Sequence, residues 1–517
     1  MPTLKLGNNS LLTLSTRITT PSIHIQKDGD HWYVPLFSGS KGAVVQSGDY
    51  NYTLGGLKVG SYRAAIGREA MGGEEAVVDI IYVFASDNIT WILTSNGDLY
   101  GCGNNSCGQQ GSGDTEKVLT FTKRASNVKE VSYSENTTWY IDTSNNLYGC
   151  GDNNTGQQGS GASGGSAKVL TFTKRAENVK TVSCTSDATW YIDNNNDLYG
   201  CGANSYGQQG SGTSGNSTNV LVFTKRASNV KEVSCTYLTT WYIDNNNNLY
   251  GCGSGMHGHQ GSGNTTIVKT FTKRASNVKE VCCGWDTTWY IDNNNNLYGC
   301  GYGWDGLQGS GNTSDVLTFT KRAENVKEVS CSRYTTWYVD NNNNLYGCGD
   351  GWNGQQGSGD TNSVYTFTKR AENVKTVSCS QDTTWYIDNN NDLYGCGKGS
   401  YGQQGSGDTE NVLTFTKRAS NVKEVSYSQE TTWYIDNNNN LYGCGNGSYG
   451  QQGSGNTGKV LTFTKRTSNV KTVSCSQDTT WYIDNNNNLY GCGDGWNGQQ
   501  GSGNTDTVLT FTQLIIK

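Results

Sequence analysis

The 517-residue chain has only 33% apolar residues, yet its Tyr and Trp residues, 31 and 14 in number, recur at regular positions, a pattern that excludes intrinsic disorder. The net charge of −6 gives no reason to expect nucleic acid as a partner. No run of about 18 apolar residues occurs, so we expect no membrane insertion.

Residues 1–77 form the first predicted domain, because they do not match the rest of the chain. Within them the segments SIHIQ and HWYVPLF flank Lys27-Asp28-Gly29-Asp30, a sequence typical of a hairpin turn. We expect a small β-rich module. Its predicted role is attachment or oligomerisation, so the chain could form a homo-oligomer through these residues.

Residues 78–517 form the second predicted domain, a repeat of nine units of 48 to 51 residues. A Trp marks the same place in every unit, and nine copies at one period indicate a repeat architecture. These residues are Trp91, Trp139, Trp190, Trp241, Trp289, Trp337, Trp385, Trp433 and Trp481.

Each unit predicts four short strands, as in residues 373–380, 383–388, 392–396 and 412–418. An Asn-rich turn follows the second strand, and Asn tolerates the left-handed conformation of a tight hairpin. A Gly-rich loop precedes the fourth strand. With no helical period, these features favour an all-β fold, a β-propeller of about nine four-stranded blades. The units could close into a ring without a strand from the other terminus, or form an open washer.

The 17 cysteines follow the repeat. Nine belong to the LYGCG segments and six follow the Val-Ser step, where Tyr133 and Tyr427 take the same place in two units. Because Tyr can replace Cys at this place, these cysteines are expected to pack and not to form bonds. The two series lie on strands separated by a third strand, too far apart for a disulfide without distortion. We expect buried reduced thiols that act as small hydrophobic groups, with Cys107 and Cys282 as extras. A Cys102–Cys107 pair is the alternative.

One motif connects the units to a known family. In the unit around Trp385 it consists of Leu393, Tyr394, Cys396 and Gly397, followed by Gly402, Gln403, Gln404, Gly405 and Gly407. This unit resembles the repeat of the regulator of chromosome condensation family of β-propellers, and the resemblance covers residues 78–517. The chain departs from that family by Cys in place of Trp, Gln in place of Leu, Thr383 in place of His, a missing Pro before the fourth strand, and nine units where seven blades are usual.

The resemblance implies guanine-nucleotide exchange on a small GTPase as one function. In that family a special insertion from one blade does the exchange. Here the only changes of length are three extra residues in the loops near Gly164 and near Gly215, and no basic tail exists. We therefore rank this function below the others.

The units differ mainly in two places, between strands one and two and at the start of the Gly-rich loop. In a four-stranded antiparallel blade both connections emerge at one end, so we expect one variable face, rich in aromatic residues suited to binding. Drift in unconstrained loops is the alternative. The predicted binding residues are Tyr206, Tyr237, Met256, His257, Trp285, Trp304, Tyr334, Trp352, Tyr401, Tyr449 and Trp496.

Motifs that suggest chemistry are weak here. Gly397–Gly402 matches GxGxxG, but no helix is predicted after it to hold a pyrophosphate. His257 and His259 lack further ligands at metal spacing, and one Asp per Asn-rich turn is few for Ca²⁺. A catalytic residue should be singular, whereas nearly everything here recurs. We expect no enzyme, no cofactor and no metal.

We therefore expect a binding and display protein that contacts a protein or glycan on a host surface. The opening MPTLKLGNNSLL is similar to the short starts of phage tail or fibre proteins and lacks a classical signal peptide. These features favour a virion or an extracellular surface as the location. The alternative is a cytoplasmic scaffold for protein–protein interaction, or an inhibitor.

Overall fold

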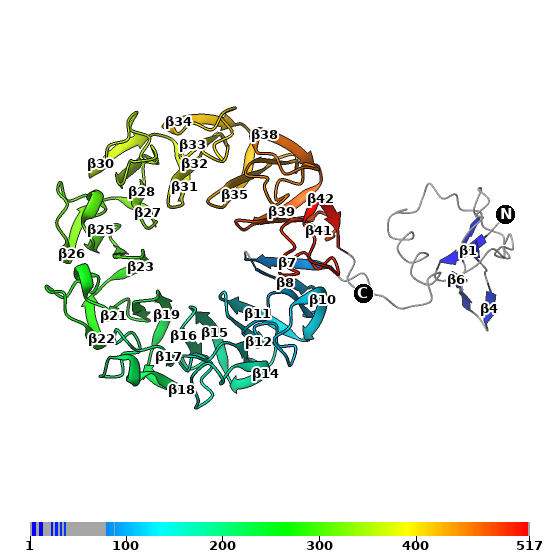
Figure 1. The fold of residues 1–517 in the computed structure, drawn as a ribbon, viewed down its shortest axis with the longest axis horizontal. Helices are drawn as coiled ribbons and strands as arrows, with labels where there is room; N and C mark the ends of the chain where they lie inside the picture. Colours follow the sequence, from blue (N-terminus) through cyan, green and yellow to red (C-terminus); the bar gives the residue numbers. More distant parts are fainter. Residues whose placement is uncertain are drawn as a thin grey trace. The chain divides into compact units, whose positions relative to one another are not determined.

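The computed structural model describes residues 79–86 and 88–514, together with the backbone of short strands between residues 3 and 37. Within residues 79–514 nine four-stranded antiparallel sheets follow one another around a ring (Figure 1). Each sheet consists of four consecutive strands and is called blade 1 to blade 9 in chain order. The predicted all-β propeller of nine blades is confirmed.

The first strand of each blade lies nearest the centre of the ring (Figure 1). These inner strands are β7 (Ile80–Ala85), β11 (Val128–Tyr133), β15 (Val179–Cys184), β19 (Val230–Cys235), β23 (Val278–Cys283), β27 (Val326–Cys331), β31 (Val374–Cys379), β35 (Val422–Tyr427) and β39 (Val470–Cys475). The second strands are β8 (Ile89–Thr94), β12 (Thr137–Asp142), β16 (Ala188–Asp193), β20 (Thr239–Asp244), β24 (Thr287–Asp292), β28 (Thr335–Asp340), β32 (Thr383–Asp388), β36 (Thr431–Asp436) and β40 (Thr479–Asp484).

The third strands carry the LYGCG segments. They are β9 (Leu99–Gly103), β13 (Leu147–Gly151), β17 (Leu198–Gly202), β21 (Leu249–Gly253), β25 (Leu297–Gly301), β29 (Leu345–Gly349), β33 (Leu393–Gly397), β37 (Leu441–Gly445) and β41 (Leu489–Gly493). The outer strands are β10 (Val118–Ala125), β14 (Val169–Ala176), β18 (Val220–Ala227), β22 (Val268–Ala275), β26 (Val316–Ala323), β30 (Val364–Ala371), β34 (Val412–Ala419), β38 (Val460–Thr467) and β42 (Val508–Gln513). The described part of the ring contains three short 3₁₀ turns: η2 (Asn216–Thr218), η3 (Met256–Gly258) and η4 (Trp304–Gly306).

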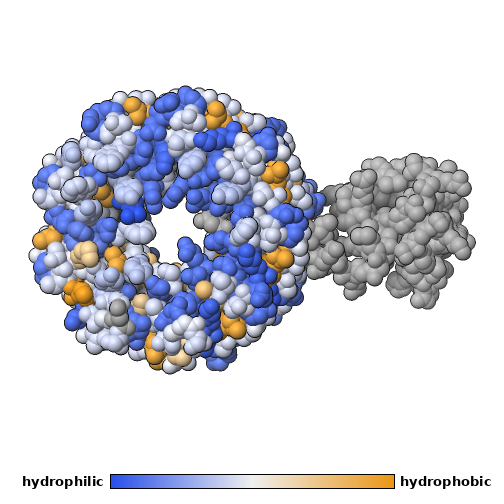
Figure 2. Space-filling view, viewed as in Figure 1, coloured by the Kyte–Doolittle hydropathy of each residue, from blue (hydrophilic) through white to orange (hydrophobic). Residues whose placement is uncertain are grey.

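The ring is closed, and a hole passes through its middle (Figure 2). Blades 9 and 1 lie side by side in Figure 1, and β39 and β40 of blade 9 contact β7 of blade 1. The amide of Ile80 donates to Asn487 O at 3.3 Å, and Thr90 Oγ1 donates to Gln499 O at 2.9 Å. Each blade contains only its own four consecutive strands, so packing between blades closes the ring without a shared strand.

The repeated Trp forms the core between adjacent blades. Trp385 is fully buried and packs against Val422 and Tyr434 of the next blade. It lies opposite Gly395 across the β32–β33 pair, and a Cβ at Gly395 would meet the indole Cζ3 atom at 2.4 Å. The Gly of LYGCG is therefore required because the indole covers its Cα, and the same pairing recurs from blade to blade.

The Asn-rich turns adopt the predicted left-handed conformation. Asn391 has a φ of 61°, and Asn421 at the other constant corner has a φ of 63°. Asp388 Oδ1 accepts hydrogen bonds from the amides of Asn390 (2.9 Å) and Asp392 (2.8 Å). The carboxylate of Asp388, which opens the turn, thus stabilises the turn itself, as Asp commonly does in Asx turns.

One disulfide contradicts the prediction that all cysteines are reduced. Cys282 of β23 is bonded to Cys331 of β27, with Cα atoms 6.9 Å apart. Two cysteines within one unit were predicted to be too far apart to pair, but Cys331, the partner of Cys282, lies on the neighbouring blade. One blade further on, Ser330 Oγ lies 3.3 Å from Cys379 Sγ. Cys282 replaces the Ser of this contact, which brings two sulfur atoms together.

The other fifteen cysteines are free, Cys102 and Cys107 among them. Cys396 is fully buried and its thiol donates to Gln355 O of the preceding blade at 3.4 Å. Burial raises the pKa of the Cys475 thiol to about 11, and raises that of Cys396 still further above its usual range. These thiols pack as small hydrophobic groups, as predicted.

The N-terminal strands include the predicted hairpin. β4 (Gln26–Asp28) pairs antiparallel with β5 (His31–Tyr33) on either side of Gly29-Asp30. The remaining short strands are β1 (Thr3–Leu6) paired with β2 (Ser10–Thr13), and β3 (Ser22–Ile23) paired with β6 (Leu36–Phe37). Most of residues 1–77 lie outside the described residues, so the role of this module stays a prediction. In the described part of the chain no helix is long and apolar enough to cross a membrane.

Candidate binding face

The first variable place is the tip of a tight turn between strands one and two. In blade 7 the amide of Ser380 donates to Thr383 O at 2.9 Å, and the amide of Thr383 donates to Ser380 Oγ at 3.2 Å. The variable pair Gln381-Asp382 occupies the two central positions. Blade 6 repeats this frame with Ser332 and Thr335. The constant Ser and Thr hold the turn, and the pair between them is free to vary.

The second variable place is a turn framed by glycines and by the GQQG motif. The amide of Gly402 donates to Gly399 O at 2.6 Å, so Ser400-Tyr401 forms the tip. Gln403 Oε1 accepts from the amide of Tyr401 at 2.9 Å, and Gln404 Nε2 donates to Cys396 O at 2.8 Å. The GQQG motif therefore fixes the turn from behind.

The two kinds of turn meet on one face of the ring. Gln403 Nε2 donates to Gln429 O at 3.2 Å, which joins the outer turn of blade 7 to the inner turn of blade 8. Gln451 and Gln477 repeat the contact one blade further on, at 3.4 Å. The tips form two concentric sets. The inner turns, between strands one and two, lie beside the central hole, which we call the channel, and the outer turns, between strands three and four, lie beyond them. We call this surface the variable face.

Most of the predicted binding residues protrude from the variable face. The exposed fraction is 73% for Trp352, 70% for Trp496 and 61% for Trp285. Large side chains this exposed do not lie down to cover the blades, which weakens the alternative of passive loop drift. Also exposed are Tyr237, Met256, Trp304 and Tyr449, whereas Tyr206, His257, Tyr334 and Tyr401 are half-buried.

The structure brings some predicted residues together across blade boundaries. The rings of Tyr206 and Tyr237 lie 6.4 Å apart, edge to face. Lys117 Nζ lies 5.2 Å from the ring centre of Trp496, within the range of a cation–π contact. The exposed Trp304 and Trp352 stand on separate blades. The variable face thus offers several small aromatic sites.

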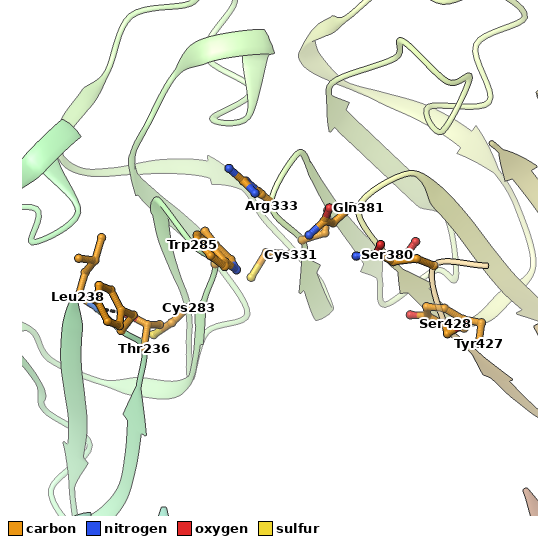
Figure 3. Close-up of a pocket in the computed structure, with 14 residues that line it drawn as sticks. Thr236, Leu238, Cys283, Trp285, Cys331, Arg333, Ser380, Gln381, Tyr427 and Ser428 are labelled. Carbon is orange, nitrogen blue, oxygen red and sulfur yellow. Dashed lines mark hydrogen bonds between the residues drawn. The ribbon is translucent and has the colours of Figure 1, made fainter. Parts of the chain in front are cut away.

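One part of the variable face is hollow. A cavity of about 610 Å³ lies at the mouth of the channel over the inner turns of blades 4 to 8 (Figure 3), and we call it the recess. Its lining consists of Thr236, Tyr237, Leu238, Cys283, Gly284, Trp285, Cys331, Ser332, Arg333, Ser380, Gln381, Tyr427, Ser428 and Gln429. A volume of this size is typical of small-molecule sites.

Two residues of this lining were predicted from the sequence, whereas its cation, Arg333, was not. Tyr237 and Trp285 were predicted, and both line the recess. In blade 6 the aromatic Tyr334 was selected, whereas its neighbour Arg333 lines the recess instead. The variability of the Arg333-Tyr334 pair was the available signal, and selection by aromatic type passed over the Arg. Gln381 and Gln429 were missed for the same reason.

The two histidines of blade 4 contact neighbouring side chains of the propeller. His257 Nδ1 lies 2.9 Å from Asp315 Oδ2, and its ring packs 4.4 Å from that of Tyr302. His259 is buried, with Nε2 at 3.5 Å from Asp286 Oδ1 and without a hydrogen bond. Among the described residues no group of three or more His, Cys, Asp or Glu could hold a metal ion.

His259 predicts a pH dependence of stability. Burial lowers its pKa from 6.5 to about 4, despite the opposing charges of Asp286 and Asp315, with His257 lowering it further. As the pH falls, His259 is protonated in the unfolded chain before it is protonated in the folded one. The free energy of unfolding is therefore highest above pH 6.5 and declines as the pH falls toward 4, by about 3 kcal/mol at most. His259 takes the place of the first Gln of GQQG, so H259Q should remove this decline in urea denaturation.

Leu307 provides the matched control, because it occupies the same motif position in blade 5 and is buried. L307Q introduces the same side chain but removes no titratable group. The pH dependence of this variant should equal that of the unmodified chain. An unchanged decline in H259Q would show that His259 is not its source.

Comparison with known proteins supports the repeat. The family model of the regulator of chromosome condensation (RCC1) repeat matches residues 80–109, which span β7 to β9 and the start of the following loop of blade 1. Blade 1 is therefore similar to an RCC1 repeat, and the match covers this part of the chain. No curated protein sequence matched the chain.

Solved propellers are similar at low identity. Human WBSCR16 shares 16% identity with a TM-score of 0.43, over 58% of this chain and 85% of that one. Prp20p from Saccharomyces cerevisiae shares 14% identity with a TM-score of 0.45, over 78% of this chain and 90% of that one. At these values the functions of the two proteins do not carry over to this chain.

Proposed function

We propose that this chain is a non-enzymatic binding scaffold whose variable face contacts a partner protein or glycan. The observation that carries the proposal is the exposure of large aromatic side chains, such as Trp352 and Trp496 at 73% and 70%, on a constant turn frame. Such side chains provide large contact area at low entropy cost. Because the blades differ mainly at the tips, recognition can change with little change in the scaffold.

We further propose that the propeller is displayed on a virion or another extracellular surface, with residues 1–77 as the attachment module. The Cys282–Cys331 disulfide supports this location, because disulfides persist in oxidising environments and are rare in the cytosol. The resemblance of MPTLKLGNNSLL to the starts of phage tail or fibre proteins supports it as well. The host partner would then be a surface protein or a surface glycan.

The test is the triple replacement of Trp304, Trp352 and Trp496 with Ala. We would first measure binding of the unmodified chain to a glycan array and to purified surface-protein fractions. For at least one ligand that binds, the triple variant should lose at least about tenfold in affinity, because exposed Trp residues dominate such interfaces. Circular dichroism would establish that the fold is kept.

The matched control replaces Val222 and Tyr365 with Ala, because both are large exposed side chains on the outer strands β18 and β30. This double variant should bind as the unmodified chain does. Retention of every affinity in the folded triple variant would contradict the proposal. Equal losses in both variants would assign the effect to surface hydrophobicity in general.

A further inference from the structure

The recess has a single charged residue. Of its fourteen lining residues only Arg333 carries a charge, and none is acidic. The guanidinium carbon lies 4.8 Å from the ring centre of Trp285 and 5.2 Å from that of Tyr334. Stacking on aromatic faces holds a guanidinium in place and leaves its N–H edges available for an acceptor.

The acidic residues beside the recess are occupied by other partners. Asp382 binds Lys398 Nζ at 3.1 Å, and Glu430 accepts from Asn446 Nδ2 at 2.6 Å. Asp286 lies 3.5 Å from the buried His259. Among the described residues no carboxylate forms an ion pair with Arg333. Of these three carboxylates only that of Asp382 is paired with a cation, and Arg333 is the single charge within the recess lining itself.

The rest of the lining offers flat apolar surface and neutral hydrogen-bonding groups. Trp285 and Tyr237 are exposed by 61% and 54%. The amides of Gln381 and Gln429 can both donate and accept. The hydroxyls of the three Ser residues are engaged in holding their own turns. Figure 3 shows Trp285 and Arg333 on neighbouring blades at one wall, with Ser380 and Gln381 beyond them. Aromatic faces beside side-chain amides suit a ring with several hydroxyl groups.

The main chain of the inner turns is less suited to a peptide. The amide of Ser332 donates to Thr335 O, that of Gly284 to Thr287 O and that of Ser428 to Thr431 O, each at 2.9 Å. Extended peptides gain much of their affinity from free main-chain groups at a strand edge. At these turns the main chain is already satisfied, so recognition must come from the side chains.

We propose that the recess binds an acidic sugar, a pyranose ring that carries a carboxylate. The carboxylate binds the edge of Arg333, the ring lies against the aromatic surface of Trp285 and Tyr237, and its hydroxyls bind the side-chain amides of Gln381 and Gln429. A single Arg without a second cation matches a monoanion better than a doubly charged phosphate. This inference rests on the proposed binding function and names the ligand class of one part of the variable face.

Isothermal titration calorimetry with defined sugars tests the proposal. The probes are 3′-sialyllactose and an unsulfated glucuronate-containing disaccharide, which separate the two common sources of a sugar carboxylate, with lactose as the neutral reference. At least one acidic probe should bind, and lactose should bind at least tenfold more weakly. R333Q should reduce the affinity for the acidic probe at least tenfold and abolish its dependence on salt.

The matched control is Y365A, because Tyr365 is also a large exposed aromatic side chain but lies on the outer strand β30, outside the recess. W285A should weaken the acidic sugar, and Y365A should not. Equal binding of lactose and sialyllactose, or full affinity in folded R333Q, would overturn the proposal. So would tighter binding of a hexaglutamate peptide than of either acidic sugar.

The outcome is separable from that of the proposed function. The triple variant of Trp304, Trp352 and Trp496 leaves the recess intact, so it should keep acidic-sugar binding. If neither acidic probe binds while the triple variant still loses another ligand, the sugar assignment fails and the variable face remains the binding surface. If R333Q loses sugar and the triple variant loses nothing, the recess stands and the wider proposal fails.

Discussion

Replacement of Trp481 with Ala is expected to open the propeller between blade 9 and blade 1. Trp481 is 1% exposed, and its ring packs edge to face on Phe121 of blade 1 with centres 5.8 Å apart. Truncation of a buried Trp costs about 3–5 kcal/mol. Because no strand is shared at this joint, packing and a few hydrogen bonds are all that keep the ring closed.

Trp337 gives the matched control. It is equally buried and packs on Phe415 of the next blade at 5.7 Å. The chain continues directly from blade 6 into blade 7 at this joint, from Ala371 of β30 to Val374 of β31. Both variants should lower the urea midpoint by a similar amount. Only W481A should show open rings in electron-microscopy class averages and a larger radius of gyration.

Two results would contradict this account. Closed rings in W481A at the frequency of the unmodified chain would show that other contacts suffice for closure. Open rings in W337A at the same frequency as in W481A would show that chain continuity contributes little to holding two blades together.

The scaffold could be predicted from the sequence because the chain contains nine copies of it. The left-handed Asn391 and the short hairpin around it follow from residue type alone. The fixed Trp and Gly of each unit indicate one strand pair, and the structure places Trp385 over Gly395. What one copy leaves ambiguous, the others resolve, so strand positions and the variable face were both recovered.

Contacts between non-equivalent residues of neighbouring blades could not be predicted. Arg333 is a cation on a variable turn, and its stacking on Trp285 depends on how blades 5 and 6 are placed. A repeat pattern describes what the units share, whereas the recess is built from what they do not share. The left-handed conformations of His257 and Asp305, with φ of 57° and 54°, were not predicted either, although His and Asp are among the non-Gly residues that adopt this conformation most often.

Cys282→Ser is expected to produce the second large loss of stability. The disulfide to Cys331 spans 49 residues, and a loop of that size is worth about 4 kcal/mol in the chain-entropy description. The new Ser recreates the Ser–Cys contact of the next joint, Ser330 with Cys379, so packing should be kept. Dithiothreitol should lower the urea midpoint of the unmodified chain to that of C282S, and should not change C282S.

Thiol titration in denaturant provides an independent count. The chain has 17 cysteines, of which fifteen are free, so the unmodified protein should titrate fifteen thiols before reduction and all of them after it. C107S is the control, because Cys107 is a free and half-exposed thiol, and this variant should keep its sensitivity to dithiothreitol. A urea midpoint of the unmodified chain that does not respond to reduction would rule out a stabilising link.

Since Cys331 also lines the recess, loss of the link should weaken acidic-sugar binding in C282S, which connects the rigidity of this joint to recognition.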